Sequence, residues 1–329
     1  MARSLIPMAL LAVFGSSPLL AQGAPDPVTS GALSVDKTSQ TEEVRFGTES
    51  ADRMTVPVLL SGSGPYRFMV DTGANRTTIS RQLASQLNLQ SSGKAVLHSV
   101  VGATVAKTVF VPSLQLTRRP VKAIEAPLLE SANMGADGIL GTDALGLQRV
   151  EFDFATQTMS IVPSSRFESK DEPGTIVIEG RRRNGRLIIT DATANGRKLT
   201  VILDTGSEIT VGNEALRRAL SKGGLLPDTQ PVALLSVTGD VIQGDYMFLR
   251  ELEIGGITLQ NLAIVFAPVH TFNQLKLNDK PAVLLGMNAM RAFKKVSIDF
   301  ANLTMRVIVP ESSRLDVQVA ERATPQIGR

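Results

Sequence analysis

Two aspartates stand directly after apolar segments, and each is followed by Thr-Gly. Asp71 follows the letters FMV, and Asp204 follows VIL. A carboxylate at the end of a buried strand is costly unless it is hydrogen-bonded or used in chemistry. The Thr-Gly supplies a hydroxyl and backbone donors in a tight turn, where glycine permits a close approach. One such triplet fits an ordinary turn, whereas two copies at matched places favour a functional pair of carboxylates.

Both triplets belong to an internal repeat, which is the first feature to seek in a chain of this length. Four segments match in the same order: YRFMVDTGA (66–74) with LTVILDTGS (199–207), SVVG (99–102) with SVTG (236–239), GILG (138–141) with VLLG (283–286), and FDF (152–154) with IDF (298–300). The offset between the copies grows slowly along the chain. We therefore expect two similar lobes, with loop insertions in the second.

The elements that position these motifs are mainly strands. Short β-branched or aromatic runs bounded by turn residues predict strands at 54–60, 66–70, 105–111, 151–154 and 158–162, and at 175–179, 187–192, 198–203, 296–300 and 305–309. A short helix follows each triplet, at 80–89 with Ser80 as its cap and at 213–222 with Asn213 as its cap. The basic run Arg181–Arg183 precedes Asn184-Gly185, which favours a solvated loop before a hairpin turn.

Together these motifs resemble those of the retropepsin-like aspartic proteases, the superfamily shared by retroviral and pepsin-type enzymes. DTGA at Asp71 is similar to the retroviral form, and DTGS at Asp204 to the pepsin form. Thr77 and Thr210 each follow the aspartate by six residues, and GILGTDAL from Gly138 is similar to the second family signature. The resemblance implies a mainly β, duplicated two-lobed acid-protease barrel fold with short helices. It also implies that the glycine ending GILG or VLLG lets that segment approach the active-site loop.

The same resemblance implies that Asp71 and Asp204 are catalytic and need no metal or organic cofactor. Two carboxylates in contact cannot both ionise easily and therefore share one proton, an effect for which the aspartic-protease pair is itself the standard example. The ionised member would draw a proton from a bound water, which attacks the peptide carbonyl. The roles belong to the pair, and the sequence leaves open which member carries the proton.

Residues on either side of the pair are expected to support it. They are Thr72, Gly73 and Ala74 after the first aspartate, and Thr205, Gly206 and Ser207 after the second. By resemblance, Thr72 and Thr205 bond to the opposite loop and hold the carboxylates coplanar. Ser207 is expected to bond the outer oxygen of Asp204, which Ala74 cannot do for its own aspartate, so the site should be chemically asymmetric.

Two further segments are candidates for the flap, the flexible hairpin that covers the substrate in that superfamily. They are Val100, Val101 and Gly102 in the first half, and Val237, Thr238 and Gly239 in the second. A glycine tip beside valine suits a mobile hairpin and fits an ordinary hairpin equally well. The first segment lacks the tyrosine of pepsin flaps, and neither is as glycine-rich as the retroviral flap, which leaves substrate choice open.

Composition narrows the classes of function. The 329 residues suggest about two domains, with 43% hydrophobic and 20% charged residues. The net charge of +3 gives no reason to expect a nucleic-acid partner. Without cysteine there are no disulfides, thiolate metal sites or cysteine nucleophiles. The two histidines, His98 and His270, lie in no metal-binding or Ser-His-Asp motif.

The N-terminus predicts export. Arg3 precedes an apolar run from Leu5 to Phe14 that is too short to cross a bilayer, and Ala21 suits a cleavage site. A buried N-terminal helix or an uncleaved anchor remains an alternative. We expect a signal peptide at 1–21, a flexible linker at 22–50, an N-terminal lobe at 51–165, a C-terminal lobe at 166–311 and a flexible tail at 312–329. The mature protein is expected in the periplasm or outside the cell, without a stable membrane anchor and as a monomer.

Three hypotheses for function follow. The first is an aspartic endopeptidase that hydrolyses peptides or proteins, favoured because both aspartates are present. The second is a non-catalytic peptide-binding module on the same fold, since a fold does not fix a function. The third is a precursor in which 22–50 is a removable pro-segment, although its low hydrophobicity favours a plain spacer.

Overall fold

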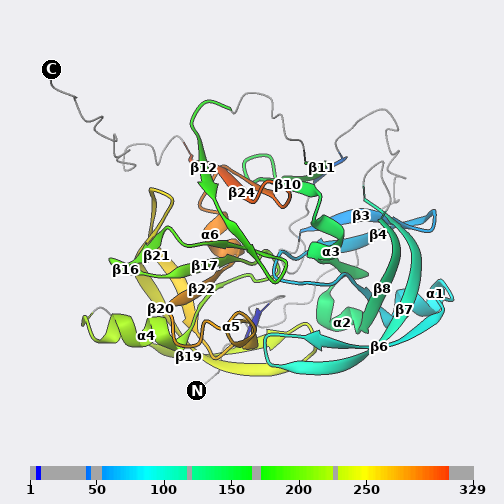
Figure 1. Cartoon of the computed structure of the whole chain (residues 1–329), viewed down its shortest axis with the longest axis horizontal. Coiled ribbons are helices and arrows are strands. Elements are labelled where there is room, and N and C mark those ends of the chain that lie inside the picture. Colours follow the sequence, from blue (N-terminus) through cyan, green and yellow to red (C-terminus); the bar gives the residue numbers. More distant parts are fainter. Residues whose placement is uncertain are drawn as a thin grey trace, which may run out of the picture.

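The computed structural model describes residues 5–8, 42–45, 54–116, 121–164, 172–224 and 229–310. Within these residues the chain forms three β-sheets with short helices between the strands (Figure 1). One sheet is built from the first half of the chain, another mainly from the second half, and the third takes strands from both halves. No helix in the described part is long and apolar enough to cross a membrane.

The first half forms a seven-stranded sheet. Its order is β3 (Thr55–Leu60), β4 (Ser63–Val70), β9 (Gly138–Leu140), β5 (Thr78–Ser80), β8 (Val121–Leu129), β7 (Ala103–Gln115) and β6 (Ser91–His98). Its helices are α1 (Arg81–Gln86), α2 (Ser131–Met134) and α3 (Thr142–Leu145). The predicted cap of the first helix is confirmed, because Ser80 Oγ accepts a hydrogen bond from the Leu83 N–H at 3.0 Å.

The second half supplies every strand except β1 of an eleven-stranded sheet. Its main path is β1 (Leu5–Met8), β19 (Gln230–Ser236), β20 (Val241–Ile254), β21 (Ile257–Phe266), β18 (Thr210–Gly212), β22 (Ala282–Leu285), β17 (Thr200–Leu203), β14 (Arg186–Ile189) and β13 (Arg181–Arg183). Beside it, β15 (Ala192–Ala194) pairs with β20 and with β16 (Arg197–Lys198). The helices are α4 (Glu214–Ser221), α5 (His270–Gln274) and α6 (Met287–Met290). Asn213 caps α4 as predicted, with Oδ1 accepting from Leu216 N–H at 2.9 Å.

The predicted duplication is visible in the strand pairing. In the first half β9 lies parallel to β4 and antiparallel to β5, and in the second half β22 lies parallel to β17 and antiparallel to β18. Val70 is thereby level with Leu140, and Leu203 with Leu285. Each of the two aspartates directly follows the end of an equivalent strand, Asp71 after β4 and Asp204 after β17.

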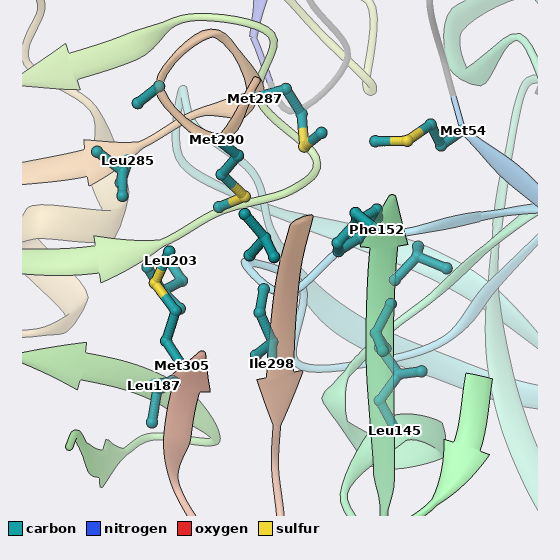
Figure 2. Packing of buried hydrophobic residues seen from close by; sticks show 14 of the residues in the cluster. Met54, Leu145, Phe152, Leu187, Leu203, Leu285, Met287, Met290, Ile298 and Met305 are labelled. Carbon is teal, nitrogen blue, oxygen red and sulfur yellow. The ribbon is translucent and has the colours of Figure 1, made fainter. Parts of the chain in front are cut away.

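The third sheet joins the halves. Its order is β12 (Thr175–Glu179), β24 (Thr304–Ile308), β23 (Lys295–Asp299), β10 (Gln148–Asp153), β11 (Thr158–Pro163) and β2 (Glu42–Arg45). The antiparallel pair β10–β23 links one half to the other. Figure 2 shows the buried side chains around this junction, where Phe152 of β10 and Ile298 of β23 belong to one continuous hydrophobic cluster. Both side chains are fully buried.

Three expectations about local structure need correction. Arg181–Arg183 is not a loop but the exposed strand β13, because its backbone pairs with β14 while its side chains stay solvated. The hairpin turn beyond it is confirmed, with positive φ at Asn184 and Gly185. Residues 42–45 of the predicted linker form β2, since the edge of β11 offers them backbone partners. The strand predicted at 187–192 ends at Ile189, and Ala192 begins β15.

Other parts of the predicted organisation stay predictions. Residues 5–8 of the predicted signal peptide form β1, which runs parallel to β19. The remaining residues of 1–21, most of 22–50 and the predicted tail at 312–329 lie outside the described residues.

Candidate active site

The two aspartates meet at the boundary between the lobes. The backbone N–H of Asp71 donates to Leu140 O at 3.0 Å, and that of Asp204 donates to Leu285 O at 3.1 Å. These bonds anchor both residues to the strands that flank them. Each aspartate is only 4% exposed. The local reason is the same in both lobes: a buried apolar strand ends, and Thr-Gly turns the chain back.

Thr72 and Thr205 tie the two turns together, as the resemblance implies. Thr205 Oγ1 accepts from the Thr72 N–H at 3.0 Å, and Thr72 Oγ1 accepts from the Thr205 N–H at 3.0 Å. Each hydroxyl also donates to a carbonyl of the opposite lobe, Thr72 to Leu203 O at 2.9 Å and Thr205 to Val70 O at 2.8 Å. Four reciprocal bonds therefore fix the relative position of the aspartate-bearing strands.

Gly73 and Gly206 bring each turn against the opposite carboxyl group. A Cβ added at Gly73 would lie 2.5 Å from Asp204 Oδ1, and one added at Gly206 would lie 2.4 Å from Asp71 Cγ. Any side chain at these positions would displace a carboxyl group. The turn sequence thus requires glycine, because each loop packs directly on the carboxyl group of the opposite lobe.

The environment of the pair disfavours two negative charges. Burial, and then the charge of Asp204, raise the pKa of Asp71 well above its usual range. Burial also raises the pKa of Asp204, although the charge of Arg186 and the hydrogen bond from Asp71 oppose the rise. Asp71 Oδ1 accepts from Gly73 N–H at 2.8 Å and Ala74 N–H at 3.0 Å, and Asp204 Oδ1 accepts from Gly206 N–H at 3.1 Å. The two carboxyl groups therefore titrate together as one pair.

Ser207 does not bond to Asp204 through its hydroxyl, which corrects the prediction. Ser207 Oγ donates to Ile209 O at 2.7 Å instead. A hydroxyl carries one proton, and the turn presents this carbonyl to it at close range. Ser207 contacts Asp204 through its backbone N–H. The predicted asymmetry between Ala74 and Ser207 therefore does not arise from a serine hydroxyl on the carboxylate.

A second pair of matched contacts supports the turns from behind. Thr77 donates through N–H and Oγ1 to Asp143 Oδ1, at 2.9 and 2.7 Å. Thr210 donates in the same way to Asn288 Oδ1, at 2.8 and 2.9 Å. Both threonines could be singled out from the sequence, whereas their partners were not predicted. The signal was present, since Asp143 and Asn288 each stand two residues after the glycine of the GILG or VLLG motif.

Those motif glycines make the close approach that the resemblance implies. An added Cβ at Gly141 would lie 2.5 Å from the backbone of Arg76, and one at Gly286 would lie 2.5 Å from the backbone of Ile209. Both motifs are fully buried strands that press on the active-site loops.

A pocket opens over the pair. It is lined by Asp71, Gly73, Ala74, Asn75, Arg76, Thr78, Val96, Leu97, His98, Ser99, Val100, Leu129, Ile139, Arg186, Asp204, Val237 and Thr271. Another pocket, lined in part by Glu214, Arg217 and Asp245, shares no residue with it and contains none of the predicted site residues.

The two candidate flaps are the turns of hairpins at this pocket, β6–β7 and β19–β20. Val100 is 4% exposed and packs in a cluster whose other members come from the second half. Val237 is 8% exposed and packs in a cluster formed by the first half. Each hairpin therefore crosses to the opposite lobe.

The other residues of the two candidate flaps have different surroundings. Val101 is partly exposed, Gly102 has open space around it, and Gly239 lies against Asn133. Thr238 Oγ1 donates to Asp240 within its own turn.

His98 and His270, far apart in sequence, come together beside the first hairpin. Nδ1 of His98 and Nε2 of His270 lie 3.1 Å apart, and the rings stack with centroids 5.3 Å apart. The His270 N–H also donates to Val100 O at 2.7 Å. Burial, His270 and Arg186 lower the pKa of His98. Sequence reasoning could not find this contact, since no motif links the two residues.

Arg186 is a further residue that the sequence analysis did not single out. It is 3% exposed, lines the pocket, and donates from Nε to Gly73 O at 2.7 Å. A signal existed, because Arg186 begins an otherwise apolar strand, Leu187–Ile189.

Two family models match the chain, one in each half. Residues 56–147 match a model described as "gag-polyprotein putative aspartyl protease", and residues 190–289 match one described as "Aspartyl protease". Among curated proteins, none matches this chain. Each matched segment contains one Asp-Thr-Gly and the following GILG or VLLG motif.

Proposed function

The chain belongs to the retropepsin-like aspartyl protease superfamily, as two tandem domains, and from this premise we propose that it is an aspartic endopeptidase that works through Asp71 and Asp204. The observation that carries the proposal is the buried carboxyl pair, one member from each lobe, at the floor of a pocket. Burial of two titratable groups in a pocket with raised pKa values is typical of a catalytic site.

In the proposed mechanism the pair holds one proton and one negative charge. The ionised carboxylate takes a proton from a water bound between the two groups, and the water oxygen attacks the peptide carbonyl carbon. The protonated carboxyl group donates to the carbonyl oxygen as negative charge develops there. A proton then passes to the leaving nitrogen, the C–N bond breaks, and the pair returns to its starting charge. Thr72 and Thr205 keep the carboxyl groups aligned throughout.

The proposed substrate is an extended segment of a peptide or protein. The strand β6 is at the edge of its sheet, and its residues Val96, Leu97 and His98 line the pocket. It offers backbone groups there, a setting in which extended peptides bind by main-chain hydrogen bonds. Apolar side chains at the pocket, such as Leu97, Leu129 and Ile139, favour apolar substrate side chains next to the cleaved bond.

The test uses unfolded casein over a range from acid to neutral pH, with and without pepstatin. We expect fragments in the parent chain that pepstatin suppresses, and none from Asp71→Asn or Asp204→Asn. Asp191→Asn is the matched control, because it makes the same change at an exposed position and should cleave as the parent does. Tight peptide binding without fragments at any pH would instead favour the non-catalytic binding module.

We further propose that the mature protein is exported to the periplasm or beyond, and that it acts as a monomer. The basic start, short apolar run and small residue at Ala21 support export. The presence of both aspartates in one chain supports a site that needs no second copy. N-terminal sequencing of the exported protein tests the cleavage site, and a start well beyond Gln22 would favour a removable pro-segment.

A further inference from the structure

We propose that Arg186 is a positioning residue for the carboxyl pair, which holds the Gly73 turn in place and supplies the positive charge that stabilises the singly ionised pair. The inference deepens the proposed function and rests on it. It starts from geometry: Arg186 begins strand β14 in the second lobe, and its Nε bonds to a carbonyl in the aspartate-bearing turn of the first lobe at 2.7 Å. One side chain thus connects the two halves of the site.

The burial of this guanidinium requires a compensating negative charge. Arg186 is 3% exposed, and its Nη1 is buried without a hydrogen-bond partner among the described residues. An arginine stays protonated in proteins, so its charge cannot be relieved by losing a proton. A buried cation is strongly destabilising unless an anion lies near it. The negative charges that act on Arg186 in the described part of the chain are those of Asp204 and Asp71.

The compensation is reciprocal. A pair with both protons leaves Arg186 uncompensated, whereas a pair with one proton carries the single negative charge that matches it. Arg186 therefore favours the charge state in which one carboxylate can accept a proton from water while the other donates. Its positive charge also lowers the pKa of both aspartates relative to burial alone. Without Arg186, the loss of the first proton from the pair should require a higher pH.

Other charged groups face the same space. Arg76 lines the pocket, and His98 lies near Arg186 and against His270. Burial, His270 and Arg186 all lower the pKa of His98, so this ring is neutral over the upper part of the pH range. Arg186 differs from these neighbours because it is buried and bonded to the aspartate-bearing turn.

The experiment follows the protonation of the pair in the full chain by carbon-13 NMR of labelled aspartate carboxyl groups, assigned with Asp71→Asn and Asp204→Asn. In Arg186→Gln, which keeps a donor for the Gly73 carbonyl but no charge, we expect the first ionisation of the pair to move to higher pH. Arg183→Gln is the matched control, because Arg183 pairs with Arg186 across the β13–β14 hairpin but is exposed, and it should leave the titration unchanged. A titration that is the same in Arg186→Gln as in the parent, or moves to lower pH, overturns the proposal.

Arg186→Lys separates charge from geometry. It keeps a cation, so the first ionisation should stay near that of the parent, while kcat/KM falls by about 10- to 100-fold because an ammonium on a flexible stem holds the turn less accurately. A titration shifted to higher pH in Arg186→Lys would overturn the role of the charge, and this variant decides the matter if Arg186→Gln does not fold. Because the NMR reading needs no turnover, a parent chain with Arg186-dependent titration but no peptidase activity would reject the proposed function alone. Peptidase activity in the parent, together with a titration of the carboxyl pair that is unchanged in Arg186→Gln, would reject this inference alone.

Discussion

Both aspartates lie in buried positions, where an ionised carboxylate is less stable than it is in water. Burial raises the pKa of Asp71 above the value of about 3.9 that an unfolded aspartate has. A group with a raised folded-state pKa contributes stability below its unfolded pKa, and this contribution is lost as the pH rises through the folded pKa. The site should therefore lower the free energy of unfolding at neutral pH, a cost often found where function needs buried charge.

Asp71→Asn should be more stable than the parent at pH 7, and the difference should close as the pH falls below about 4. The asparagine amide can still donate to Asp204, but it cannot ionise. Urea unfolding at several pH values measures the difference, and Asp191→Asn, at an exposed site, should show no such trend. A parent that is more stable than Asp71→Asn at neutral pH would contradict the raised pKa.

The reciprocal threonine bonds make a second prediction at the residue scale. Thr72→Val keeps the shape but leaves the Thr205 N–H and the Leu203 carbonyl without partners. At about 1–3 kcal/mol for each buried unpaired group, the free energy of unfolding should fall by about 2–6 kcal/mol. Thr72→Ser keeps the hydroxyl and should lose only about 1 kcal/mol for the missing methyl group. Equal losses in the two variants, measured by urea unfolding, would show that the hydroxyl bonds do not stabilise the fold.

Side-chain contacts in the site were predictable only where the repeat constrained them. Thr72 and Thr205 occupy matched places, so symmetry requires that each meets the other's turn. Ser207 has no such constraint, and its single proton goes to the Ile209 carbonyl because of the shape of the turn. The contact of Arg186 with the turn of the first half could not be predicted, because nothing in the sequence indicates which residues of the other half its side chain meets.

At the scale of elements, each hairpin reaches from its own lobe to the other. The first hairpin is held by the contact between His98 and His270 and by the bond from His270 N–H to Val100 O. Two stacked imidazoles repel when both are protonated, so acid should weaken this contact. The second hairpin has no histidine and relies on apolar packing of Val237. Acid should therefore loosen the first hairpin more than the second.

The chain has only two histidines, so their ring signals can be followed singly by NMR. In the parent, His98 should titrate below the ordinary value of about 6.5. In His270→Asn its midpoint should rise, because the neighbouring positive charge is gone while the burial remains. An unchanged or lower midpoint for His98 would mean that the two rings do not interact in solution.

The predicted strands were most accurate where short β-branched or apolar runs are bounded by turns, as at β3, β12, β23 and β24. The exposed strand β13 was taken for a loop because three arginines carry no apolar alternation, although backbone pairing alone suffices to form it. Short helices such as α3 and α6 hold four residues each, too few to show a helical period. Their positions are set by the glycine motifs that precede them rather than by propensity.

At the scale of the whole molecule, the sheet shared by the two lobes should make them unfold as one unit. Phe152 in β10 is fully buried beside β23, so Phe152→Ala should lower the free energy of unfolding by about 3–5 kcal/mol. Both halves should unfold together in a single urea transition. Phe248→Ala is the matched control, at 55% exposure, and should cost less than about 1 kcal/mol. Separate transitions for the two halves would show that the lobes are independent.

The duplication and the two-lobed architecture could be predicted from the sequence, because four motifs repeat in the same order. The six-stranded sheet between the lobes was not predicted as a unit. Its strands come from distant parts of the chain, and only the pairing of β10 with β23 shows that the strands carrying the matched FDF and IDF motifs are neighbours. Sequence repeats reveal equivalent positions, whereas contact between equivalent positions depends on how the copies pack.

The central claim is that Asp71 and Asp204 act as one unit in peptide hydrolysis. The most direct measurement is kcat/KM on a single peptide for the parent, Asp71→Asn, Asp204→Asn and the double variant. Residues that act as a unit show non-additive losses, so each single substitution should reduce the rate about as far as the double one does. A single variant that retains substantial activity, or losses that simply add, would contradict a catalytic pair.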